Sequence, residues 1–389
     1  MKETRFKDTE IGQIPEDWEM KILGEICDFR NGYTPSKSIN RYWENGSIPW
    51  FRMEDIRTNG RILSDSIQHI TEIAVKDSLF PAGSIIISTT ATIGEYALLI
   101  VDSLANQRFT NLTIRKSLTR AIDIMWFFHY CNVLGRWCRS NINEGGLAAV
   151  NMIDLQNILI PIPSTPEQVR IASALTSVDN LISSLDKLIE KKKNIKQGTM
   201  QQLLTGKKRL KGFSDPWVER KMETIEIKNG SILNSNEYKA GNIPVIAGGK
   251  HPAGYHSSSN RLANTITISA SGANAGYISF YKQPIFASDC STINKQKGIS
   301  VEFLYYCLLL RQNEIYKCQT GGAQPHIHAK DIKDIEIPIP SAILEQKRIA
   351  SIIESMDDEI SSLETKKAKF EQIKQGMMQQ LLTGKIRLI

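Results

Sequence analysis

Several hallmarks of membrane proteins and disulfide-bonded proteins are absent from the sequence. The longest apolar run, Phe303–Leu310, covers eight residues, whereas a helix that spans a bilayer needs about 20. The segment Met1–Glu10 is charged and lacks the apolar core of a signal peptide. The six cysteines form no C-x-x-C pair, which argues against a zinc ribbon or a thiol-redox motif. We therefore expect a cytoplasmic protein with free thiols and no membrane partner.

Motifs for catalysis and for cofactor binding are absent as well. Gly206-Lys207 lacks the rest of a phosphate-binding loop, and Asp215-Pro216-Trp217 lacks the second proline of the adenine methyltransferase motif. The Glu-x-Lys triplets Glu345–Lys347 and Glu364–Lys366 resemble nuclease motifs but fall in charged helical sequence. The pair His326–His328 has no evident third metal ligand. We expect no catalytic residue, no metal and no cofactor in this chain.

The charge and the length of the chain are consistent with several domains and a polyanionic partner. With 389 residues, the chain is long enough for two or three domains. The formal net charge is +7, and excess Lys and Arg can neutralise phosphates. Lys191–Lys193 and Lys207–Lys211 form basic clusters, for which phosphate contact and a solvated helix face are both open.

The sequence contains an internal repeat. Residues 195–210 (IKQGTMQQLLTGKKRL) match residues 373–388 (IKQGMMQQLLTGKIRL) at all but two positions. Upstream, the PIPS segments that begin at Pro161 and Pro338 lead to Glu167 and Glu345, which lie 178 residues apart. Since repeats report the architecture directly, we expect a globular segment and a helix, each present twice.

The globular segments are alike only at scattered positions. The paired positions are Trp18 and Trp217, Asn31-Gly32 and Asn229-Gly230, Ile48-Pro49 and Ile243-Pro244, Ile87-Ser88 and Ile268-Ser269, Gly94 and Gly276, Gly145-Gly146 and Gly321-Gly322, and Asp154 and Asp331. Nearly identical helices beside diverged globular segments suggest that the two segments recognise different things. The alternative is a duplicated scaffold without separate recognition functions.

Both repeated segments have the spacing of coiled-coil helices. Apolar residues alternate at steps of four and three, which is an a/d seam. The seam residues are Ile171, Leu175, Val178, Ile182, Leu185 and Ile189 in the first helix and Ile349, Ile353, Met356, Ile360, Leu363 and Phe370 in the second. The first helix has an expected length of roughly 57 Å. Two such helices bury their seams if they pair, which predicts an antiparallel coiled coil; helices packed on separate domains are the alternative.

Sequence signals predict where these helices begin and end. Thr165 and Gln168 have the spacing of a capping box, and Ser341 is the expected cap of the second helix. Gly206 and Gly384 suit the left-handed residue that ends a helix.

Each globular segment is predicted to be a small α/β domain. Short β-like runs occur at 84–88, 111–114, 265–269 and 276–280, and one helix is expected near 121–138 and another near 301–318. Polar loops between them offer the donors and acceptors that DNA base edges need. The candidate DNA-binding residues are Tyr33, Lys37, Arg41, Arg52, Thr89, Thr90, Thr92, Asn106, Arg108, Lys250, His251, Tyr255, His256, Ser271, Asn274 and Gln324.

The repeated motifs carry a family resemblance. The PIPS entry with its Glu-Gln pair, at Pro161–Ala172 and Pro338–Ala350, and the exits Lys196–Lys207 and Lys374–Lys385 are similar to those of the specificity subunit of type I restriction–modification enzymes. The resemblance covers essentially the whole chain. It implies a non-catalytic subunit of a multisubunit adenine-specific DNA methyltransferase or type I restriction endonuclease, in which each variable domain recognises one half of a bipartite, asymmetric double-stranded DNA target.

The resemblance also implies an architecture and partners. The fold is expected to be α+β and pseudo-two-fold symmetric, with a target recognition domain at 1–160, a spacer helix at 161–211, a second recognition domain at 212–337 and a second spacer helix at 338–389. The helices set the gap between the half-sites. Two methyltransferase subunits, and restriction subunits in the full complex, are implied partners, with S-adenosylmethionine and ATP with Mg as their cofactors.

Two questions stay open at this point. The exits Gly198–Gly206 and Gly376–Gly384 are hypothesised to dock the methyltransferase subunits, because they are the most similar parts of the repeat. The alternative function is a coiled-coil scaffold that binds protein without recognising a DNA sequence.

Overall fold

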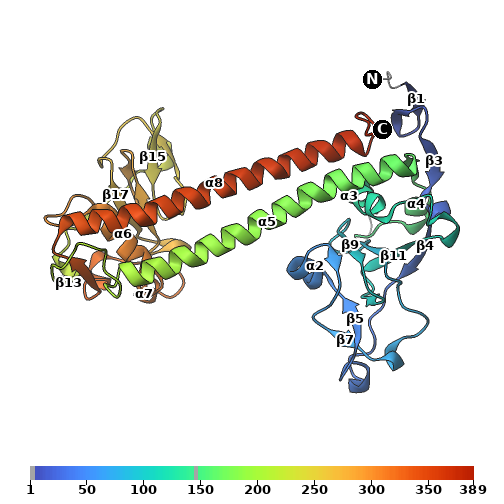
Figure 1. The fold of residues 1–389 in the computed structure, drawn as a ribbon. Coiled ribbons are helices and arrows are strands. Elements are labelled where there is room, and N and C mark those ends of the chain that lie inside the picture. The colour runs from blue at the N-terminus through green and yellow to red at the C-terminus, as the bar shows by residue number, and fades with distance from the viewer. Residues whose placement is uncertain (1–4, 144–147) are drawn as a thin grey trace. The chain divides into compact units, whose positions relative to one another are not determined.

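A computed structural model describes residues 5–143 and 148–389 and divides them into two compact units (Figure 1). Unit 1 contains the chain up to Ser184 together with Ala368–Ile389, and unit 2 contains Leu185–Lys367. The Gly145-Gly146 pair lies outside the described residues. Within the described chain, none of the helices combines the length and the apolar character needed to cross a bilayer.

Unit 1 is built on a five-stranded sheet and a three-stranded sheet. The five strands lie in the order β4 (Cys27–Asn31), β11 (Phe109–Ile114), β8 (Ser84–Ser88), β9 (Tyr96–Leu99) and β6 (Ile62–Leu63), and all pairs except β9 with β6 are antiparallel. In the smaller sheet, β5 (Ile48–Phe51) lies between β10 (Leu104–Ala105), to which it is parallel, and β7 (His69–Ile70). Two further antiparallel pairs are β1 (Phe6–Thr9) with β2 (Gly12–Pro15), and β3 (Glu19–Ile22) with β12 (Leu159–Ile162).

Unit 2 repeats this plan with fewer strands. Its larger sheet has the order β14 (Lys228–Asn229), β20 (Cys290–Ile293), β17 (Thr265–Ser269) and β18 (Ile278–Tyr281). In its smaller sheet, β15 (Ile243–Ile246) lies between β16 (Gly254–His256) and β19 (Phe286–Ala287), again with one parallel neighbour. A pair formed by β13 (Trp217–Lys221) and β21 (Glu336–Pro340) corresponds to β3 with β12. The prediction of two copies of one architecture in an α+β fold is therefore confirmed.

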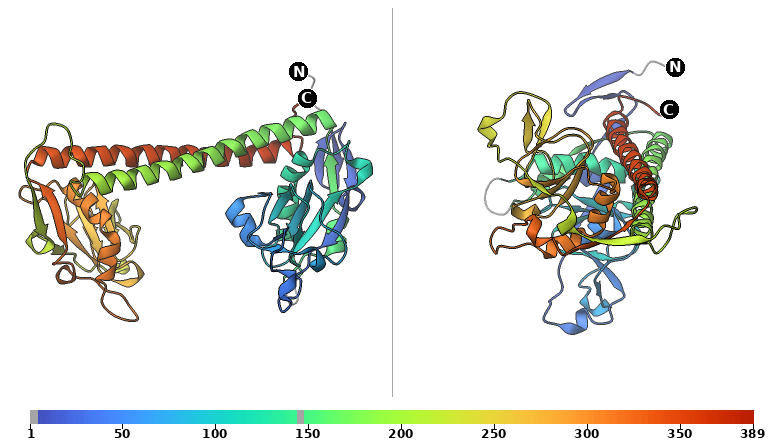
Figure 2. Two further views of the ribbon diagram at one scale, coloured as in Figure 1. Left: turned by 60° about the horizontal axis from the view of Figure 1, so that its bottom comes forward. Right: turned by 90° about the vertical axis from the view of Figure 1, so that its left-hand side faces the viewer.

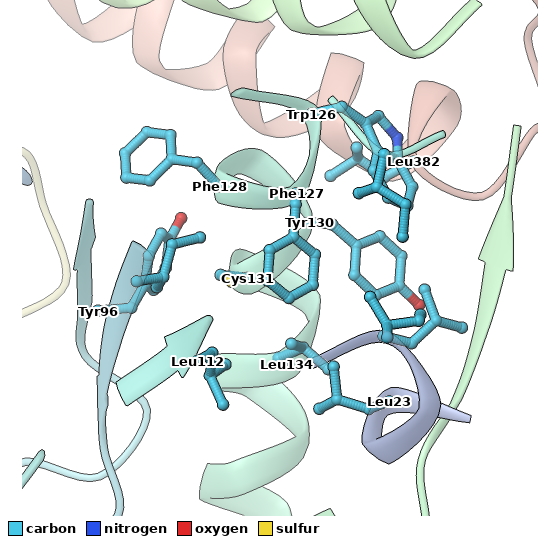
Figure 3. Packing of buried hydrophobic residues seen from close by; sticks show 14 of the residues in the cluster. Leu23, Tyr96, Leu112, Trp126, Phe127, Phe128, Tyr130, Cys131, Leu134 and Leu382 are labelled. Atoms are coloured by element: carbon cyan, nitrogen blue, oxygen red, sulfur yellow. The ribbon is translucent and has the colours of Figure 1, made fainter. Parts of the chain in front are cut away.

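One long helix closes the core of unit 1. Helix α3 (Ile124–Ser140) begins at Asp123, whose carboxylate accepts a hydrogen bond from the backbone of Trp126. The side chains of Trp126 and Phe127 are completely buried. They pack with sheet residues and with Leu382, the residue after the last helix of the chain (Figure 3). Shorter helices complete the unit: α1 (Leu23–Ile26), α2 (Met53–Asn59) and α4 (Met152–Gln156).

In unit 2 the corresponding helix is broken. The single helix expected near 301–318 is α6 (Val301–Leu310) followed by α7 (Gln312–Lys317). At the break, the side-chain amide of Gln312 accepts a hydrogen bond from the backbone of Ile278 and donates one to the carbonyl oxygen of Gly276. These two bonds hold the start of α7 against the turn that precedes β18.

The two repeated segments are the long helices α5 (Thr165–Leu203) and α8 (Ile343–Leu381), each of 39 residues. In unit 1, the first turns of α5 lie beside the last turns of α8 (Figure 1, Figure 2), and Lys374 is paired with Asp179 at 2.5 Å. In unit 2, Lys192 pairs with Glu359 at 2.6 Å and Lys367 with Asp186 at 2.6 Å. Residue numbers rise along one helix as they fall along the other, so the pairing is antiparallel in both units, as predicted.

The seam between these helices combines apolar side chains with lysine–carboxylate pairs. The seam residues that are buried are Ile171, Leu175, Leu185, Ile189, Ile349, Ile353 and Ile360, and those that are half-buried are Val178, Ile182, Met356, Leu363 and Phe370. Lys196, which interrupts the apolar pattern, is paired with Asp357 across the helices. The lysines at seam positions therefore have carboxylate partners on the facing helix.

The helix starts differ from the predicted caps, whereas the helix ends agree with the prediction. Thr165 donates its hydroxyl proton to Ala121, and the side chain of Gln168 is engaged elsewhere, so no capping box forms. Ser341 donates to the carbonyl oxygen of Pro216 instead of capping α8. Both predictions were wrong because these polar groups bind the neighbouring domain. At the other ends, Gly206 and Gly384 have φ values of 70° and 72°, in the left-handed region that terminates helices.

A buried carboxylate at each helix start is bound by an arginine that follows the other helix. Glu167, at the start of α5, is fully buried and accepts hydrogen bonds of 2.7 Å from Nε and Nη2 of Arg387. Glu345, at the start of α8, is equally buried and accepts bonds of 2.8 Å from Nε and Nη2 of Arg209. In unit 1, the indole of Trp18 also donates to Glu167 at 3.0 Å. These bidentate pairs tie the exit of each helix to the entry of the other.

The glutamine beside each glutamate joins the helix to its globular domain. Gln168 accepts a hydrogen bond from the backbone of Asp123, next to α3, and donates to Ala121 and Pro163. Gln346 makes the same set of bonds, accepting from Ser300 beside α6 and donating to two backbone carbonyls. The Glu-Gln motif thus has two structural roles, one toward the facing helix and one toward the domain.

We expect substitution of Arg387 by Met to lower the free energy of unfolding by about 3–5 kcal/mol, since Glu167 stays buried without its counter-charge. The double variant R387M/E167Q should lose much less than this, because no charge remains buried. Urea denaturation of both variants and of Arg120→Met, an exposed arginine of the same unit, measures the effect. Equal losses in the single and double variants would argue against a role for the buried charge.

His129 should make the stability of unit 1 depend on pH. Its side chain is buried and contacts the hydroxyl of Thr176 at 3.0 Å, and burial lowers the pKa of this histidine to about 4. Between its ordinary value of about 6.5 and 4, the unfolded chain binds a proton that the folded chain does not. Stability is therefore lost as pH falls through this window, by about 1.4 kcal/mol per pH unit.

The wild type should consequently lose about 2 kcal/mol more than His129→Gln between pH 7.5 and pH 5.0. Urea midpoints at the two pH values measure this difference. His251→Gln, at an exposed position, is the matched control and should follow the wild type. Parallel losses in wild type and His129→Gln would contradict the expectation.

Candidate nucleic-acid interface

One edge of the large sheet in unit 1 gathers three polar loops. The register pairs Asn31 with Thr110, Phe109 with Ser88 and Ile87 with Tyr96. The ends of β4 and β8 and the starts of β11 and β9 therefore lie along one edge. The loops at this edge cover residues 32–47, 89–95 and 106–108, and they contain most of the candidate residues predicted for the first domain.

The Asn31-Gly32 pair shapes this edge through a close approach of two backbone segments. The backbone of Gly32 donates to Phe109 at 2.8 Å, and that of Tyr33 donates to Ala105 at 2.9 Å. A Cβ at Gly32 would lie 2.4 Å from the carbonyl oxygen of Ala105 and 2.3 Å from that of Asn106. Only glycine fits here, which accounts for the recurrence of this pair in the sequence.

Unit 2 has the same edge. Asn229 pairs with Ser291, the backbone of Gly230 donates to Cys290 at 2.7 Å, and the backbone of Ser231 donates to Ala287 at 2.9 Å. A Cβ at Gly230 would lie 2.0 Å from the carbonyl oxygen of Ser288. The two units therefore hold equivalent loops on equivalent frameworks.

The turn after the central strand is supported by a second loop in both units. In unit 1 the turn after β8 bridges to the loop before α4 through Thr90 and Ala149. In unit 2 the turn after β17 bridges through Ser271 and His326, and the backbone of Gly272 donates to Pro325 at 2.9 Å. This pairing places Gln324 beside the turn that contains Ser271 and Asn274.

Two of the first domain's candidate residues serve the fold itself. Thr89 is buried, and its hydroxyl lies 3.3 Å from that of Thr110. Tyr33 donates to Ala74 at 3.0 Å and accepts from the backbone of Lys76 at 2.8 Å, and burial raises its pKa. Both side chains are therefore engaged within the domain.

The other candidates of the first domain are exposed or half-buried, although Nε of Arg52 is buried. Lys37 lies over the ring of Trp43 at 4.4 Å, and Arg52 pairs with Glu54 at 2.9 Å. Asn106 accepts from the backbone of Arg108, and the guanidinium of Arg108 is exposed. The remaining members of this accessible set are Arg41, Thr90 and Thr92.

The second domain's candidates divide in the same way. His256 is buried, and its Nδ1 accepts from the backbone of Lys239 at 2.9 Å, so it is set aside as well. Tyr255 is 57% exposed but belongs to β16 in the smaller sheet. Lys250 lies over the ring of Tyr277 at 5.4 Å, and Ser271 donates to Asp289 at the sheet edge. The remaining accessible candidates are His251, Asn274 and Gln324.

A cleft that no sequence pattern indicates lies beside this edge in unit 1. The cleft has a volume of about 770 Å³, and its lining includes Arg57, Arg61, Arg139, Ala91 and Thr92. These arginines come from α2, from the residues just after it and from the end of α3, so nothing in the linear sequence places them together. The anchoring roles of Arg209 and Arg387 were missed too, although their identical positions in the repeated exits were a usable signal.

Within the described residues, no group of three or more His, Cys, Asp or Glu side chains is arranged to hold a metal ion. The chemistry offered at the two edges consists of hydroxyls, amides, imidazole and cationic groups. Such groups donate to and accept from base edges and phosphates. The arrangement suits binding of a polyanion with sequence discrimination.

Gly230→Ala should lower the stability of unit 2 by about 1–3 kcal/mol. The added methyl group would overlap backbone atoms that cannot move independently of their neighbours. Gly322→Ala is the matched control, since a Cβ there meets nothing within 4 Å. Urea denaturation compares the two variants. A Gly230→Ala variant as stable as this control would contradict the close approach described here.

Both units match known proteins. The family model for the type I restriction modification DNA specificity domain matches residues 15–197 and 215–372. The specificity subunit of the type I restriction enzyme EcoprrI from Escherichia coli is 32% identical over 382 residues, which cover 93% of each chain. The MjaVIII specificity subunit of Methanocaldococcus jannaschii is 25% identical over 424 residues, covering 100% of this chain and 97% of that protein.

Solved structures show the same fold. A type I restriction–modification S subunit from M. genitalium superposes with a TM-score of 0.66 at 17% identity, covering 94% of this chain and 96% of that one. A chain from a structure of the type I R-M system gives 0.57 at 17% identity, with 96% and 99% covered.

Proposed function

Because the chain belongs to the family of type I restriction–modification DNA specificity domains, we propose that it recognises a two-part, asymmetric sequence in double-stranded DNA. Each unit contributes one recognition domain, and each domain binds one half of the target. The chain is a specificity subunit and leaves the chemistry to other subunits.

One observation carries this proposal: the two domains have the same framework but different side chains at the same edge. The framework is shared in strand order and in the glycine approach at Gly32 and Gly230. The accessible groups at that edge differ, with Arg108 and Asn106 in the first domain and Asn274 and Ser271 in the second. A scaffold that binds only protein would not require different polar side chains at equivalent positions of the two domains.

The groups at the edge match known base chemistry. Arginine binds the guanine edge with two hydrogen bonds, Asn and Gln bind adenine, and Ser binds either. Lysines such as Lys37 and Lys250 are suited to backbone phosphates. Specificity therefore resides in the loops, and the strands beneath them serve to hold the loops in place.

The helices are proposed to set the gap between the two half-sites. Two half-sites that are bound on one side of DNA are separated by a helical turn, about 34–36 Å, or a multiple of it. The uninterrupted helices α5 and α8 are suited to fix such a spacing, because a helix has a constant rise per residue.

The proposed partners are two methyltransferase subunits and, in the full complex, restriction subunits. Their implied cofactors are S-adenosylmethionine and ATP with Mg, the methylated base is adenine, and the complex acts in the cytoplasm. The exits Gly198–Gly206 and Gly376–Gly384 are the proposed docking sites. A Cβ at Gly198 or at Gly376 meets nothing within 4 Å, so both positions are open to a partner.

The experiment that tests this function is co-expression of the chain with the methyltransferase encoded beside it, followed by long-read mapping of adenine methylation in the host genome. A split motif with two specified halves and a fixed gap is the expected result. If the two proteins purify as a complex but no new methylated motif appears, the scaffold function is favoured instead.

Single substitutions should affect one half of the motif at a time. In the described chain, the side chains of Arg108 and Asn274 have neither a hydrogen bond nor an ion pair, so their removal costs the fold little. Loss of a base contact costs about 1–3 kcal/mol. Arg108→Ala should therefore relax one half of the methylated motif, and Asn274→Ala the other half.

Methylation maps of the two variants measure this separation. Lys317→Ala, a substitution of an exposed residue in unit 2, is the control and should leave both halves intact. Relaxation of the same half by Arg108→Ala and Asn274→Ala would contradict the assignment of one domain to each half.

A further inference from the structure

Unit 1 has an arginine cleft next to the proposed interface. We use this name for the space lined by Arg57, Arg61 and Arg139 together with Thr92. Arg57 belongs to α2, Arg139 to the last turn of α3, and Thr92 to the turn after β8. Because that turn lies at the sheet edge with the polar loops, the cleft opens beside the residues proposed to contact bases.

The cleft carries positive charge that the described protein does not neutralise. Arg61 pairs with Glu95 at 2.9 Å, and its guanidinium lies 4.7 Å from the centre of the Tyr96 ring. Among the residues that the structure describes, Arg57 and Arg139 have neither an ion pair nor a hydrogen bond to their side chains. The cleft lining also includes the carboxylate of Glu95, which pairs with Arg61, so the exposed guanidinium groups of Arg57 and Arg139 leave an excess of positive charge in the cleft.

The turn at the mouth of the cleft holds a strained residue. Ala91 has a φ of 60°, and the equivalent position in unit 2 is Gly272, with a φ of 78°. A residue with a side chain in this region costs free energy that the surroundings must offset. Thr92 follows this residue and lines the cleft with the two arginines, and its hydroxyl lies 3.4 Å from that of Ser88.

The second domain lacks two features that form this cleft. The segment between β15 and β16 contains no helix corresponding to α2. Where the guanidinium of Arg139 approaches Gly94, the ring of Tyr316 approaches Gly276 in unit 2. The helix that carries Arg57 and the approach of Arg139 to Gly94 are therefore not repeated in unit 2.

We propose that the arginine cleft binds a DNA backbone phosphate next to the half-site recognised by the first domain, as an anchor that is independent of sequence. This inference rests on the proposed function. Guanidinium groups bind phosphate oxygens with two hydrogen bonds each. A contact to phosphate strengthens binding to every sequence and releases counterions, so it contributes to the salt dependence of binding and not to discrimination.

The test measures DNA affinity of the full chain in complex with its methyltransferase, at several salt concentrations. Two duplexes are used, one with the methylated motif and one with its bases scrambled. The variants are R57A/R139A, the charge-preserving R57K/R139K, and R120A, which removes an exposed arginine from the opposite end of the large sheet. Thermal denaturation verifies that each variant is folded.

For R57A/R139A we expect weaker binding to both duplexes by the same factor, about 5-fold at 0.15 M salt. The slope of log K against log salt should become shallower by about 0.9, the contribution of one phosphate contact. R57K/R139K should retain most of the slope, and R120A should match the wild type. Unchanged slopes in R57A/R139A, or a changed methylated motif, would overturn the inference.

The two proposals fail in different ways. If the wild-type complex binds both duplexes equally, sequence recognition is wrong, but the slope of R57A/R139A still decides whether the cleft binds phosphate. Suppose that the wild-type complex prefers the duplex with the motif, and that the R57A/R139A complex binds both duplexes as tightly as the wild-type complex. In that case only the proposed phosphate contact is wrong.

Discussion

The buried glutamate at each helix start is the constraint on which the rest of the structure depends. Glu167 and Glu345 are fully enclosed, and a buried charge is tolerated only when it is paired and hydrogen-bonded. Each finds its arginine beyond the end of the other long helix, at Arg387 and Arg209. Antiparallel pairing of the helices is the arrangement that brings these groups together in both units. The coiled-coil seam and the two glycine-terminated exits are consistent with the same arrangement.

The glutamine that follows each buried glutamate explains how the loops of a domain can differ while its junction with the long helix stays the same. Gln168 and Gln346 bind only backbone groups of the adjoining domain. Backbone groups are the same whatever side chains a domain has, so a domain can change its loops and keep its junction. The same holds at Gly32 and Gly230, whose contacts are also with backbone atoms. These junctions are therefore the same in both units, although the units differ in their loops, in the number of strands and in the helices that carry the arginines of the cleft.

Much of this fold could be predicted from the sequence because its signals are local. Seam spacing gave the long helices, and glycine at 206 and 384 gave their ends. Strands such as 84–88 and 265–269 agree with β8 and β17. The caps at Thr165 and Ser341 were wrong because both side chains bind residues of the adjoining domain, at Ala121 and Pro216. The division into four segments stays a prediction, since each compact unit groups a domain with parts of both helices.

The candidate site was predictable only as a set of loops. Sequence cannot distinguish an exposed threonine from a buried one, which is why Thr89 and His256 were included with accessible residues. It also cannot show that Arg57 and Arg139, from two separate helices, line one space. Those relations depend on how distant elements pack. The charges of the two arginines were visible in the sequence, but their common location was not.

The most direct test of this account is the DNA motif methylated by a chain that carries the second domain twice. In this chain, residues 18–164 are replaced by residues 217–342, which joins the domain at its matching tryptophan and directly before the retained α5 with Glu167 and Gln168. Because recognition symmetry follows protein symmetry, the account predicts an inverted repeat of one half of the wild-type motif. A folded, methyltransferase-bound chimera that still methylates an asymmetric motif would contradict it.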